Sequence, residues 1–413
     1  MEKNVYAQRR EKVFANLEEG GCAVFFSGDL VKRSADAVYP FSVNRNFFYL
    51  TGLNEDGLIL MLVKTSQGQK EILYIKEYDA VMEKWVGSSI RSDEAKEISG
   101  IPVQYTIPQF DATFARTIVF NAIQTVYIDS ERQDVKSRPF EGENFGIKVK
   151  QLYPGLKVVN LNTTINALRT LKSAEEIEQM KKAIEITHHG LQAILRNLKP
   201  GLREYEAVAH FNYELSKHNA ATAFDTIAAS GKEATVLHYV KNDRVIQDGD
   251  LVLFDLGAQY GNYSADISRT YPANGKFTDR QKELYGLVLL AQKRVIEAIK
   301  PGVTLFALNE IVKETYRTEG VKLKVIESPE KVDEIYYHGV SHFLGLDTHD
   351  VGQVESMVLK PGNVITVEPG LYSAKEGVGI RIEDDVLVTE QGHEVLSPQI
   401  VKEIEDIEAY MSR

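Results

Sequence analysis

Short apolar runs separated by polar turns mark the first third of the chain. Residues 21–26, 58–63 and 124–129 are apolar runs of strand length, and helical segments are indicated between them. This alternation predicts an α/β domain in the N-terminal part of the chain.

The pattern changes near residue 172, where a long helix is predicted to begin. Ser173 is followed by Glu176 at the spacing of a capping box, and apolar residues then recur with a helical period as far as Leu191. A chain of 413 residues is too long for one ordinary core, so two domains are expected. We therefore predict an N-terminal domain over residues 1–172 and a C-terminal domain over residues 173–413.

A faint internal repeat runs through the C-terminal part. Lys-Pro-Gly occurs at 199–201 and again at 300–302, each time before a helical pattern. Gly249 then precedes an apolar segment that ends in an acid, and Gly362 does the same in the second half. This repeat predicts a pseudo-symmetric α+β domain in which helices back a curved antiparallel sheet.

The acid in the first of these segments is Asp255, which lies inside an apolar run. A buried, unpaired carboxylate is very costly, so it must be protonated, paired or bound to a metal. Asp266 follows beyond a good turn sequence. A hairpin centred between Tyr260 and Gly261 would place Asp255 and Asp266 opposite each other on one face.

Glu368 and Glu383 form a similar pair in the second half. A hairpin centred between Lys375 and Glu376 would place the two glutamates opposite each other. Each pair alone is also consistent with a surface pair, or with an acid and base that share a proton. Two such pairs at matching places favour metal binding, because four clustered carboxylates repel one another unless cations lie among them.

Histidines cluster along the same part of the chain. His338, His342 and His349 lie close together in sequence, and His238 lies beside another apolar segment. The spacing of His338 and His342 occurs in zinc helices, but the neighbouring glycines and the absence of a glutamate after His338 speak against that motif. The other histidines are interpreted as hydrogen-bonded structural residues: His188, His189, His210, His218 and His393.

Composition and charge exclude several classes of function. The formal net charge of -11 argues against a nucleic-acid partner, and no apolar run is long enough to span a bilayer. The charged N-terminus lacks the apolar region of a signal peptide. Cys22 is the single cysteine, which excludes an intramolecular disulfide and a cysteine-based zinc site. A cytoplasmic location without a membrane partner is expected.

The ordered acids and the histidine resemble the ligand set of the pita-bread metallopeptidases, which include methionine aminopeptidase, aminopeptidase P and prolidase. The short motifs around these residues, Ser-Arg-Thr, Glu-Pro-Gly and Ile-Arg-Ile-Glu-Asp, also resemble those of this family. Residues 33–36, 39–41 and 46–52 resemble the leading domain of aminopeptidase P, which methionine aminopeptidases generally lack. The family's five ligands correspond to Asp255, Asp266, His342, Glu368 and Glu383.

The resemblance implies two divalent metal ions, manganese foremost, with cobalt, iron or zinc as substitutes. A hydroxide that bridges the two ions would be the nucleophile, and one ion would polarise the scissile carbonyl. Glu368 would take the proton from the attacking water, and Asp255 could attract the substrate's ammonium group. The remaining implied roles are stabilisation of the tetrahedral intermediate for His238 and His349, a substrate-side or proton-shuttling role for His338, and orientation of the carboxylates or a structural salt bridge for Arg381.

The activity that this resemblance implies is removal of the first residue from peptides whose second residue is proline. Because an Xaa-Pro bond lacks an amide N–H, proteases that grip that donor handle it poorly. Trp85, Tyr39 and residues 47–49 either wall a pocket for the proline ring or pack in the core. The segment around Trp85 also resembles one that reaches a neighbouring active site in oligomeric relatives, so a homo-oligomer, a dimer or tetramer, is expected.

Three alternatives remain open from the sequence. A prolidase would use the same metals but act on Xaa-Pro dipeptides only. The metal-free, creatine-hydrolysing branch of the fold is disfavoured because all five ligand positions are intact. A non-catalytic binding module on the same fold is disfavoured for the same reason.

Overall fold

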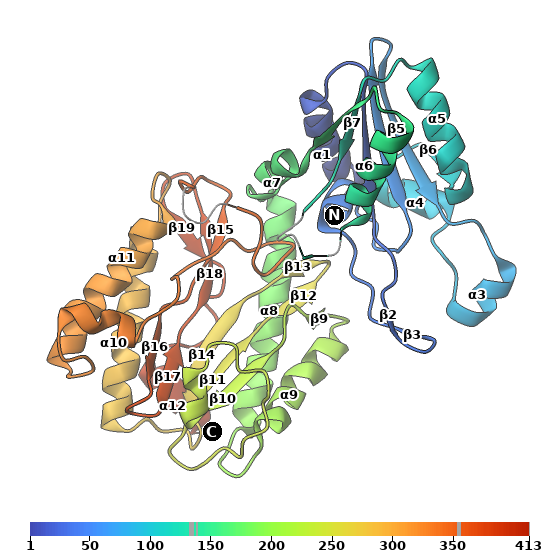
Figure 1. Ribbon diagram of the computed structural model, residues 1–413. Coiled ribbons are helices and arrows are strands. Elements are labelled where there is room, and N and C mark those ends of the chain that lie inside the picture. The colour runs from blue at the N-terminus through green and yellow to red at the C-terminus, as the bar shows by residue number, and fades with distance from the viewer. Residues whose placement is uncertain (132–135, 138, 353–356, 413) are drawn as a thin grey trace. The chain divides into compact units, whose positions relative to one another are not determined.

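The structure is a computed structural model that describes residues 1–131, 136–137, 139–352 and 357–412. It divides into two compact units, Met1–Arg169 and Thr170–Arg413 (Figure 1). The division follows Arg169, whereas the capping box on which we based the predicted boundary begins at Ser173.

The first unit is built on a six-stranded mixed sheet in the order β6-β5-β4-β1-β7-β8. The central strand β1 (Gly21–Phe26) runs antiparallel to β4 (Ile59–Thr65) and parallel to β7 (Thr125–Ile128). These three strands coincide with the apolar runs of the sequence, so the predicted α/β character is confirmed. The other strands are β2 (Lys32–Ser34), β3 (Ala37–Val38), β5 (Gly68–Ile75), β6 (Val103–Thr106) and β8 (Lys157–Asn160).

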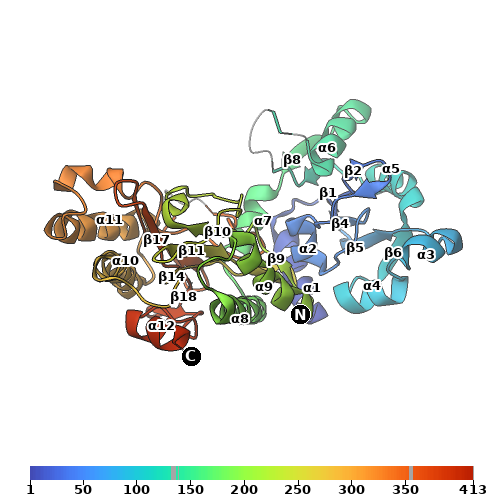
Figure 2. The ribbon, with the colours of Figure 1, turned by 90° about the horizontal axis from the view of Figure 1, so that it is seen from below.

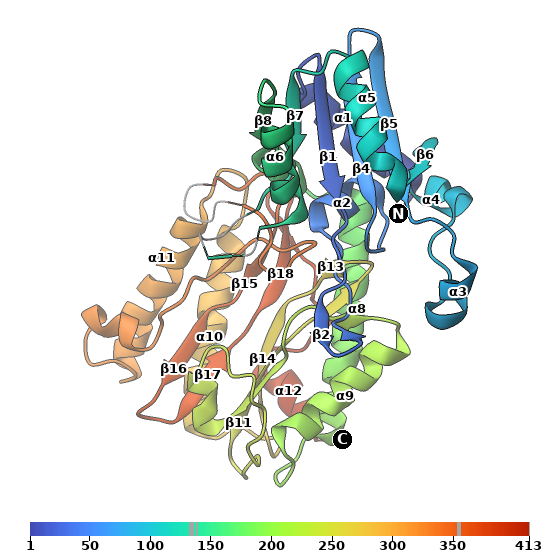
Figure 3. The ribbon, with the colours of Figure 1, turned by 45° about the vertical axis from the view of Figure 1, so that its right-hand side comes forward.

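Helices cover the sheet of the first unit. Figure 3 shows α5 (Phe110–Phe120) and α6 (Glu141–Leu152) over the strands, and their buried aromatic residues join alternate residues of the strands in one apolar cluster. The remaining helical segments are α1 (Lys3–Asn16), α2 (Arg45–Thr51), α3 (Ala80–Val86), α4 (Ser92–Ser99), η1 (Ile107–Gln109) and α7 (Asn162–Arg169).

The aromatic residues of this unit divide into two groups. Phe47, Phe48 and Tyr49 on α2 are buried, so core packing is confirmed for them. Tyr39 and Trp85 are exposed, with 53% and 81% of their surface accessible.

The second unit begins with the helix that the capping box predicted. α8 (Ala174–Asn197) starts after Ser173, whose hydroxyl accepts a hydrogen bond from the Glu176 amide while the Glu176 carboxylate accepts one from the Ser173 amide. The other helical segments are α9 (Glu204–Lys217), η2 (Gly231–Thr235), α10 (Asp279–Ala298), α11 (Leu305–Thr315), η3 (Tyr316–Gly320), η4 (Pro329–Glu334) and α12 (Ile404–Met411).

Every strand pairing described in this unit is antiparallel, in several short sheets. Figure 2 shows α8, α10 and α12 on the same side of the strands, and α8 packs on β12 and β13 while α10 packs on β15, β16 and β17. The strands are β9 (Ala221–Thr222), β10 (Ile227–Ser230), β11 (Leu251–Leu256), β12 (Ala258–Tyr260), β13 (Tyr263–Ser264), β14 (Ile267–Pro272), β15 (Val364–Val367), β16 (Gly370–Ser373), β17 (Val378–Arg381), β18 (Asp384–Val388) and β19 (His393–Val395).

The internal repeat is present in the hydrogen bonds of the second unit. The Gly201 N–H donates to the Ile246 carbonyl at 2.9 Å, and the Gly302 N–H donates to the Leu359 carbonyl at 2.9 Å. Both glycines have φ of 93°, in the left-handed region that favours glycine. The two halves therefore use the same turn before their second helix, which confirms the pseudo-symmetric arrangement.

Among the described residues, no helix combines the length and the apolar character that a membrane crossing requires.

Candidate metal centre and active site

Every residue that the sequence nominated as a metal ligand or as a catalytic group lines one pocket of about 300 Å³ in the second unit. The lining also includes Leu237, Gly339 and Ser341, which the sequence did not nominate. The nominated residues that meet there are His238, Asp255, Asp266, His338, His342, His349, Glu368, Arg381 and Glu383.

The hairpin of the two aspartates has a different register from the predicted one. Asp255 lies opposite Ser268 and not opposite Asp266. The cause is the turn, in which Gly261 and Asn262 have φ of 56° and 66° and Tyr260 pairs with Tyr263, so that the hairpin centre lies one residue further along the chain. Since the pairing shifts by two residues, both aspartates still belong to the same face of the sheet.

The hairpin of the two glutamates has the predicted register. Gly370 lies opposite Arg381 in the β16–β17 pair, and Val367 lies opposite Asp384 in the β15–β18 pair. These pairings share one register, and it places Glu368 opposite Glu383. The prediction for this hairpin is confirmed.

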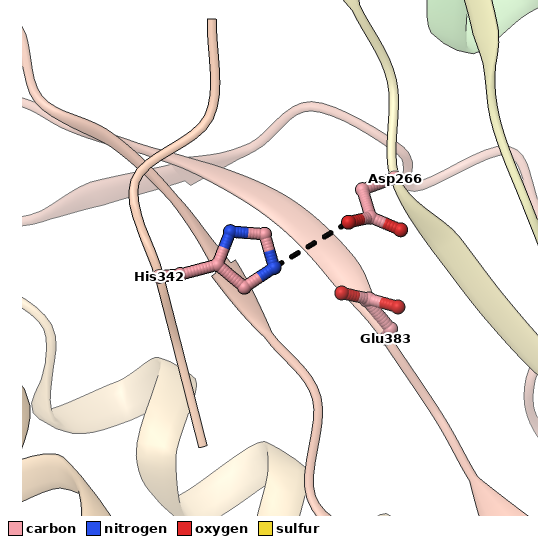
Figure 4. Close-up of side chains that lie close together, drawn as sticks. All are labelled: Asp266, His342 and Glu383. Atoms are coloured by element: carbon pink, nitrogen blue, oxygen red, sulfur yellow. Dashed lines mark ion pairs between the residues drawn. The ribbon is translucent and has the colours of Figure 1, made fainter. Parts of the chain in front are cut away.

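The tightest group of possible metal ligands is Asp266, His342 and Glu383, each of which offers one ligand atom within 4.8 Å of the others. Figure 4 shows their side chains directed toward a common point. The His342 Nε2 atom lies 3.4 Å from an Asp266 oxygen and 3.5 Å from a Glu368 oxygen. Glu383 also accepts a hydrogen bond of 2.7 Å from the Ser268 hydroxyl.

The electrostatics of this group are those of a site that needs positive charge. Burial, with neighbouring carboxylates, raises the pKa of Asp266 to about 6 and that of Glu368 to about 7, and it raises the pKa of Glu383 well above its usual range. Burial opposes the charged form of His342, but Asp266 and Glu368 outweigh it and raise its pKa to about 9. Without cations, protons compensate the clustered charge.

The donor atoms fit divalent cations. The Oδ1 atom of Asp255 is buried and has no hydrogen-bond partner among the described residues, which is unusual for a buried carboxylate oxygen. Oxygen-rich ligation with one imidazole suits hard or borderline ions. A cation would satisfy this atom and neutralise its neighbours.

Two further nominated residues, His338 and His349, lie beside this group. The His338 ring is 2.7 Å from the Gly339 carbonyl through Nδ1 and 2.9 Å from the Tyr372 hydroxyl through Nε2. Burial, with Arg381, lowers the pKa of His338 to about 4, so its ring is neutral. The His349 ring packs edge-on against the His342 ring at 4.4 Å between centroids, and burial lowers its pKa too.

Comparison with known proteins identifies the family. Residues 178–390 match metallopeptidase family M24, and residues 6–127 match the aminopeptidase P N-terminal domain. The chain belongs to metallopeptidase family M24. This confirms the predicted family and its two-domain architecture, and it makes the chain a hydrolase that depends on divalent metal ions.

Named relatives of this M24 peptidase match over nearly their whole length. The Xaa-Pro aminopeptidase of Haemophilus influenzae is 34% identical, over 99% of this chain and 97% of the relative, and that of Escherichia coli is 33% identical, over 98% and 97%. A Bacillus anthracis structure assigned to aminopeptidase P has a TM-score of 0.98 and 44% identity, and covers 100% of this chain and 99% of its own. Zinc-substituted E. coli aminopeptidase P in complex with product has a TM-score of 0.90 and 31% identity, with coverage of 100% and 98%.

Arg381 connects the two hairpins of this M24 peptidase. Its guanidinium donates to Asp255 at 2.5 Å, to the Ser268 hydroxyl at 2.8 Å and to the Tyr372 hydroxyl at 2.9 Å. Ser268 in turn donates to Glu383. Arg381 therefore forms a salt bridge with Asp255 and is linked to Glu383 through Ser268. Its contacts are consistent with both roles considered from the sequence, a structural salt bridge and orientation of the carboxylates.

Sequence reasoning missed Tyr372 and Ser268. Tyr372 is buried, lies opposite Gly379 and contacts both His338 and Arg381. Ser268 could have been found from the turn sequence, because a hairpin centred between Gly261 and Asn262 places Ser268 opposite Asp255.

Proposed function

We propose that this M24 peptidase is an Xaa-Pro aminopeptidase that uses two divalent ions, manganese foremost, to release the first residue from peptides with proline second. The observation that carries this proposal is the convergence of five ligand-type side chains and three further histidines on one pocket. The Xaa-Pro aminopeptidases that match over the full length support the same substrate class.

The ions would be held by Asp255, Asp266, His342, Glu368 and Glu383. When bound, they supply an activated water and polarise the carbonyl of the scissile bond. The unpartnered oxygen of Asp255 and the raised pKa values of the other carboxyls support this ligand set.

The chain's own side chains would supply the remaining chemistry. Glu368 takes a proton from the attacking water, which is a common role for an active-site carboxylate. His238 and His349 donate hydrogen bonds to the oxyanion of the intermediate. Asp255 attracts the substrate's ammonium group while Arg381 holds that carboxylate in place.

One experiment tests this function against its nearest alternatives. The protein is stripped of metal with a chelator, single metals are added back, and release of the first residue is measured on matched Xaa-Pro-Yaa, Xaa-Pro and Xaa-Ala-Yaa peptides. We expect metal-dependent cleavage of Xaa-Pro-Yaa, slower cleavage of Xaa-Pro and none of Xaa-Ala-Yaa. The longer leaving group adds contacts whose binding energy can be used at the transition state.

Each alternative has its own signature in this assay. A dipeptide preference of about tenfold in kcat/KM, equal to about 1.4 kcal/mol, would replace the proposal with a prolidase. Metal binding without peptide cleavage would indicate a binding module. Elemental analysis that finds no divalent metal in the reconstituted protein would contradict the metal site itself.

We also propose a cytoplasmic location and a homo-oligomer. The single buried thiol of Cys22, which forms no disulfide, supports a reducing compartment. The exposed apolar side chains of Val81, Trp85 and Val86 on α3 support contact with another subunit. Light scattering of the wild type and of Trp85→Ala tests the second statement, since a monomeric wild type would contradict it.

A further inference from the structure

A buried carboxylate outside the pocket is fully satisfied by neutral donors. Glu204, the first residue of α9, has no accessible surface. Its Oε1 atom accepts hydrogen bonds from the amide and the hydroxyl of Ser230 at 2.8 and 2.7 Å. Its Oε2 atom accepts from the Tyr239 hydroxyl and the Arg244 amide, both at 2.9 Å.

These donors bracket the loop that carries His238. Ser230 ends β10 before the loop, Arg244 lies at its far end, and Tyr239 is the residue directly after His238. The Tyr239 ring is buried in an apolar cluster with Tyr372, and Leu237 packs against the same cluster. Glu204 therefore ties together both ends of the loop and one neighbour of His238.

His238 depends on these neighbours for its position. Its side chain is exposed and lines the pocket, and none of the hydrogen bonds found among the described residues involves its ring. A histidine that must contact a reacting oxygen needs a fixed backbone when no hydrogen bond holds its ring in place.

The internal repeat indicates that the carboxylate is not required by the fold. Lys199-Pro200-Gly201 in the first half matches Lys300-Pro301-Gly302 in the second, so Glu204 matches Leu305. Leu305 also begins a helix, α11, and is also buried, with 3% of its surface exposed. An apolar side chain therefore serves at this position in the second half, while the half with the His238 loop has the carboxylate.

We propose that Glu204 is a positioning residue for His238. It acts by holding Tyr239 and the two ends of the loop, so that the imidazole faces the pocket in one place. This inference rests on the proposed role of His238 in the peptidase reaction.

Two substitutions test the contact. Glu204→Gln replaces one acceptor oxygen with an NH2 group that faces two donors, and we expect kcat to fall between about tenfold and about a hundredfold. KM and metal content should be unchanged. Tyr239→Phe keeps the ring in the cluster and removes one hydrogen bond, so kcat should fall less, in the same direction.

Tyr263→Phe is the matched control. Tyr263 is also buried and its hydroxyl also donates to a buried glutamate, Glu176, at 3.0 Å, but it lies on β13 and is not among the residues that line the pocket. We expect this variant to keep the wild-type kcat. Thermal unfolding of each variant shows whether it folds. If Glu204→Gln does not fold, the kcat of Tyr239→Phe tests the proposal in its place.

A double-mutant cycle separates positioning from a structural role. In a His238→Ala background, Glu204→Gln should leave kcat within about twofold of the single His238→Ala variant, because its effect passes through the missing imidazole. An equal fall in both backgrounds would overturn the proposal. The same cycle with Tyr239→Phe gives the same two outcomes.

A readout without substrate keeps this inference distinct from the proposed function. In protein labelled with ¹⁵N-histidine, the His238 ring signals should shift in Glu204→Gln and Tyr239→Phe but not in Tyr263→Phe. Unmoved His238 signals would overturn the inference, whatever the activity. A wild type that leaves Xaa-Pro peptides intact while these signals shift would contradict the proposed function alone.

Discussion

At the scale of single residues, the ionised form of Asp266 is disfavoured in the metal-free protein. It is buried beside Asp255, Glu383 and Glu368, and burial raises its pKa to about 6. Only a nearby cation, such as protonated His342, favours its ionised form. Asp266 is thus suited to hold a metal more than to hold the fold.

Replacement of Asp266 by Asn should therefore cost metal affinity and not stability. The amide is nearly isosteric and removes one of several repelling charges, so the metal-free variant should unfold at the wild-type temperature or above it. Metal titration by calorimetry and thermal unfolding of the metal-free protein measure the two effects. An equal loss of stability with and without metal would show that the carboxylate is a structural group.

His349→Ala tests a residue that touches a proposed ligand without being one. Its ring packs against the His342 ring, and its pKa is lowered by burial. If His349 donates to the intermediate, the variant should lose roughly 10²-fold or more in kcat while its metal content stays intact. Loss of metal together with activity would make His349 a support for the ligand. The conservative variant His349→Gln keeps a donor and should recover part of kcat.

At the scale of elements, the two hairpins show how far a sequence can specify a register. The glutamate hairpin was predicted correctly because its two acids are symmetric about the turn. The aspartate hairpin was predicted with the wrong centre, although Gly261 and Asn262 are residues that a two-residue turn with two positive φ values requires. Turn chemistry was the better guide than symmetry between the acids.

Contacts between distant elements could not be predicted in this way. The salt bridge of Arg381 with Asp255 joins the two hairpins, and a buried ion pair of 2.9 Å joins Lys172 to Asp350, directly after His349. Each pair depends on the relative placement of segments far apart in the chain. Periodicity along one segment contains no information on that placement.

The packing of β17 against η2 requires a glycine at position 379, because the two elements lie very close together there. A Cβ atom at Gly379 would lie 1.9 Å from the Ala234 carbonyl oxygen. We expect Gly379→Ala to destabilise the protein by about 1–3 kcal/mol and to lower kcat, since η2 leads into the loop of His238. Chemical denaturation measures the first effect and peptide release the second.

Gly286→Ala on α10 is the control for this prediction. A Cβ atom there meets open space, so the change should be neutral or should stabilise the helix by up to about 1 kcal/mol. If Gly379→Ala proved as harmless as Gly286→Ala, β17 and η2 would have to be further apart than described.

At the scale of the whole catalytic unit, the site forms only where the two halves of the repeat meet. The Glu383 amide donates to the Ser268 carbonyl at 3.0 Å, and the Asp266 amide donates to Asp385 at 3.2 Å. Each half supplies two of the four clustered carboxylates, and His342 comes from the second half. Assembly of the halves therefore concentrates negative charge, and the stability of the unit should depend on what neutralises that charge.

Three pKa values in this site are shifted in the same direction, and this direction determines how the stability of the unit changes with pH. Against ordinary values of 3.8, 4.5 and 6.5, the pKa values are raised to about 6 for Asp266, about 7 for Glu368 and about 9 for His342. Between the ordinary and the raised values the folded, metal-free protein binds more protons than the unfolded chain. The contribution of these groups to stability is therefore present at low pH and is lost as pH rises through the raised values.

Metal binding should reverse that loss, because ligands bind cations only after they release their protons. The increase in unfolding temperature on addition of Mn²⁺ should therefore grow from about pH 5.5 to about pH 8. Taking the difference between samples with and without metal at each pH cancels groups outside the site, such as Asp384, whose pKa is lowered. Asp266→Asn should show a smaller increase at every pH. An increase that stays constant or shrinks as pH rises would mean that the clustered carboxylates and His342 do not exchange protons for metal.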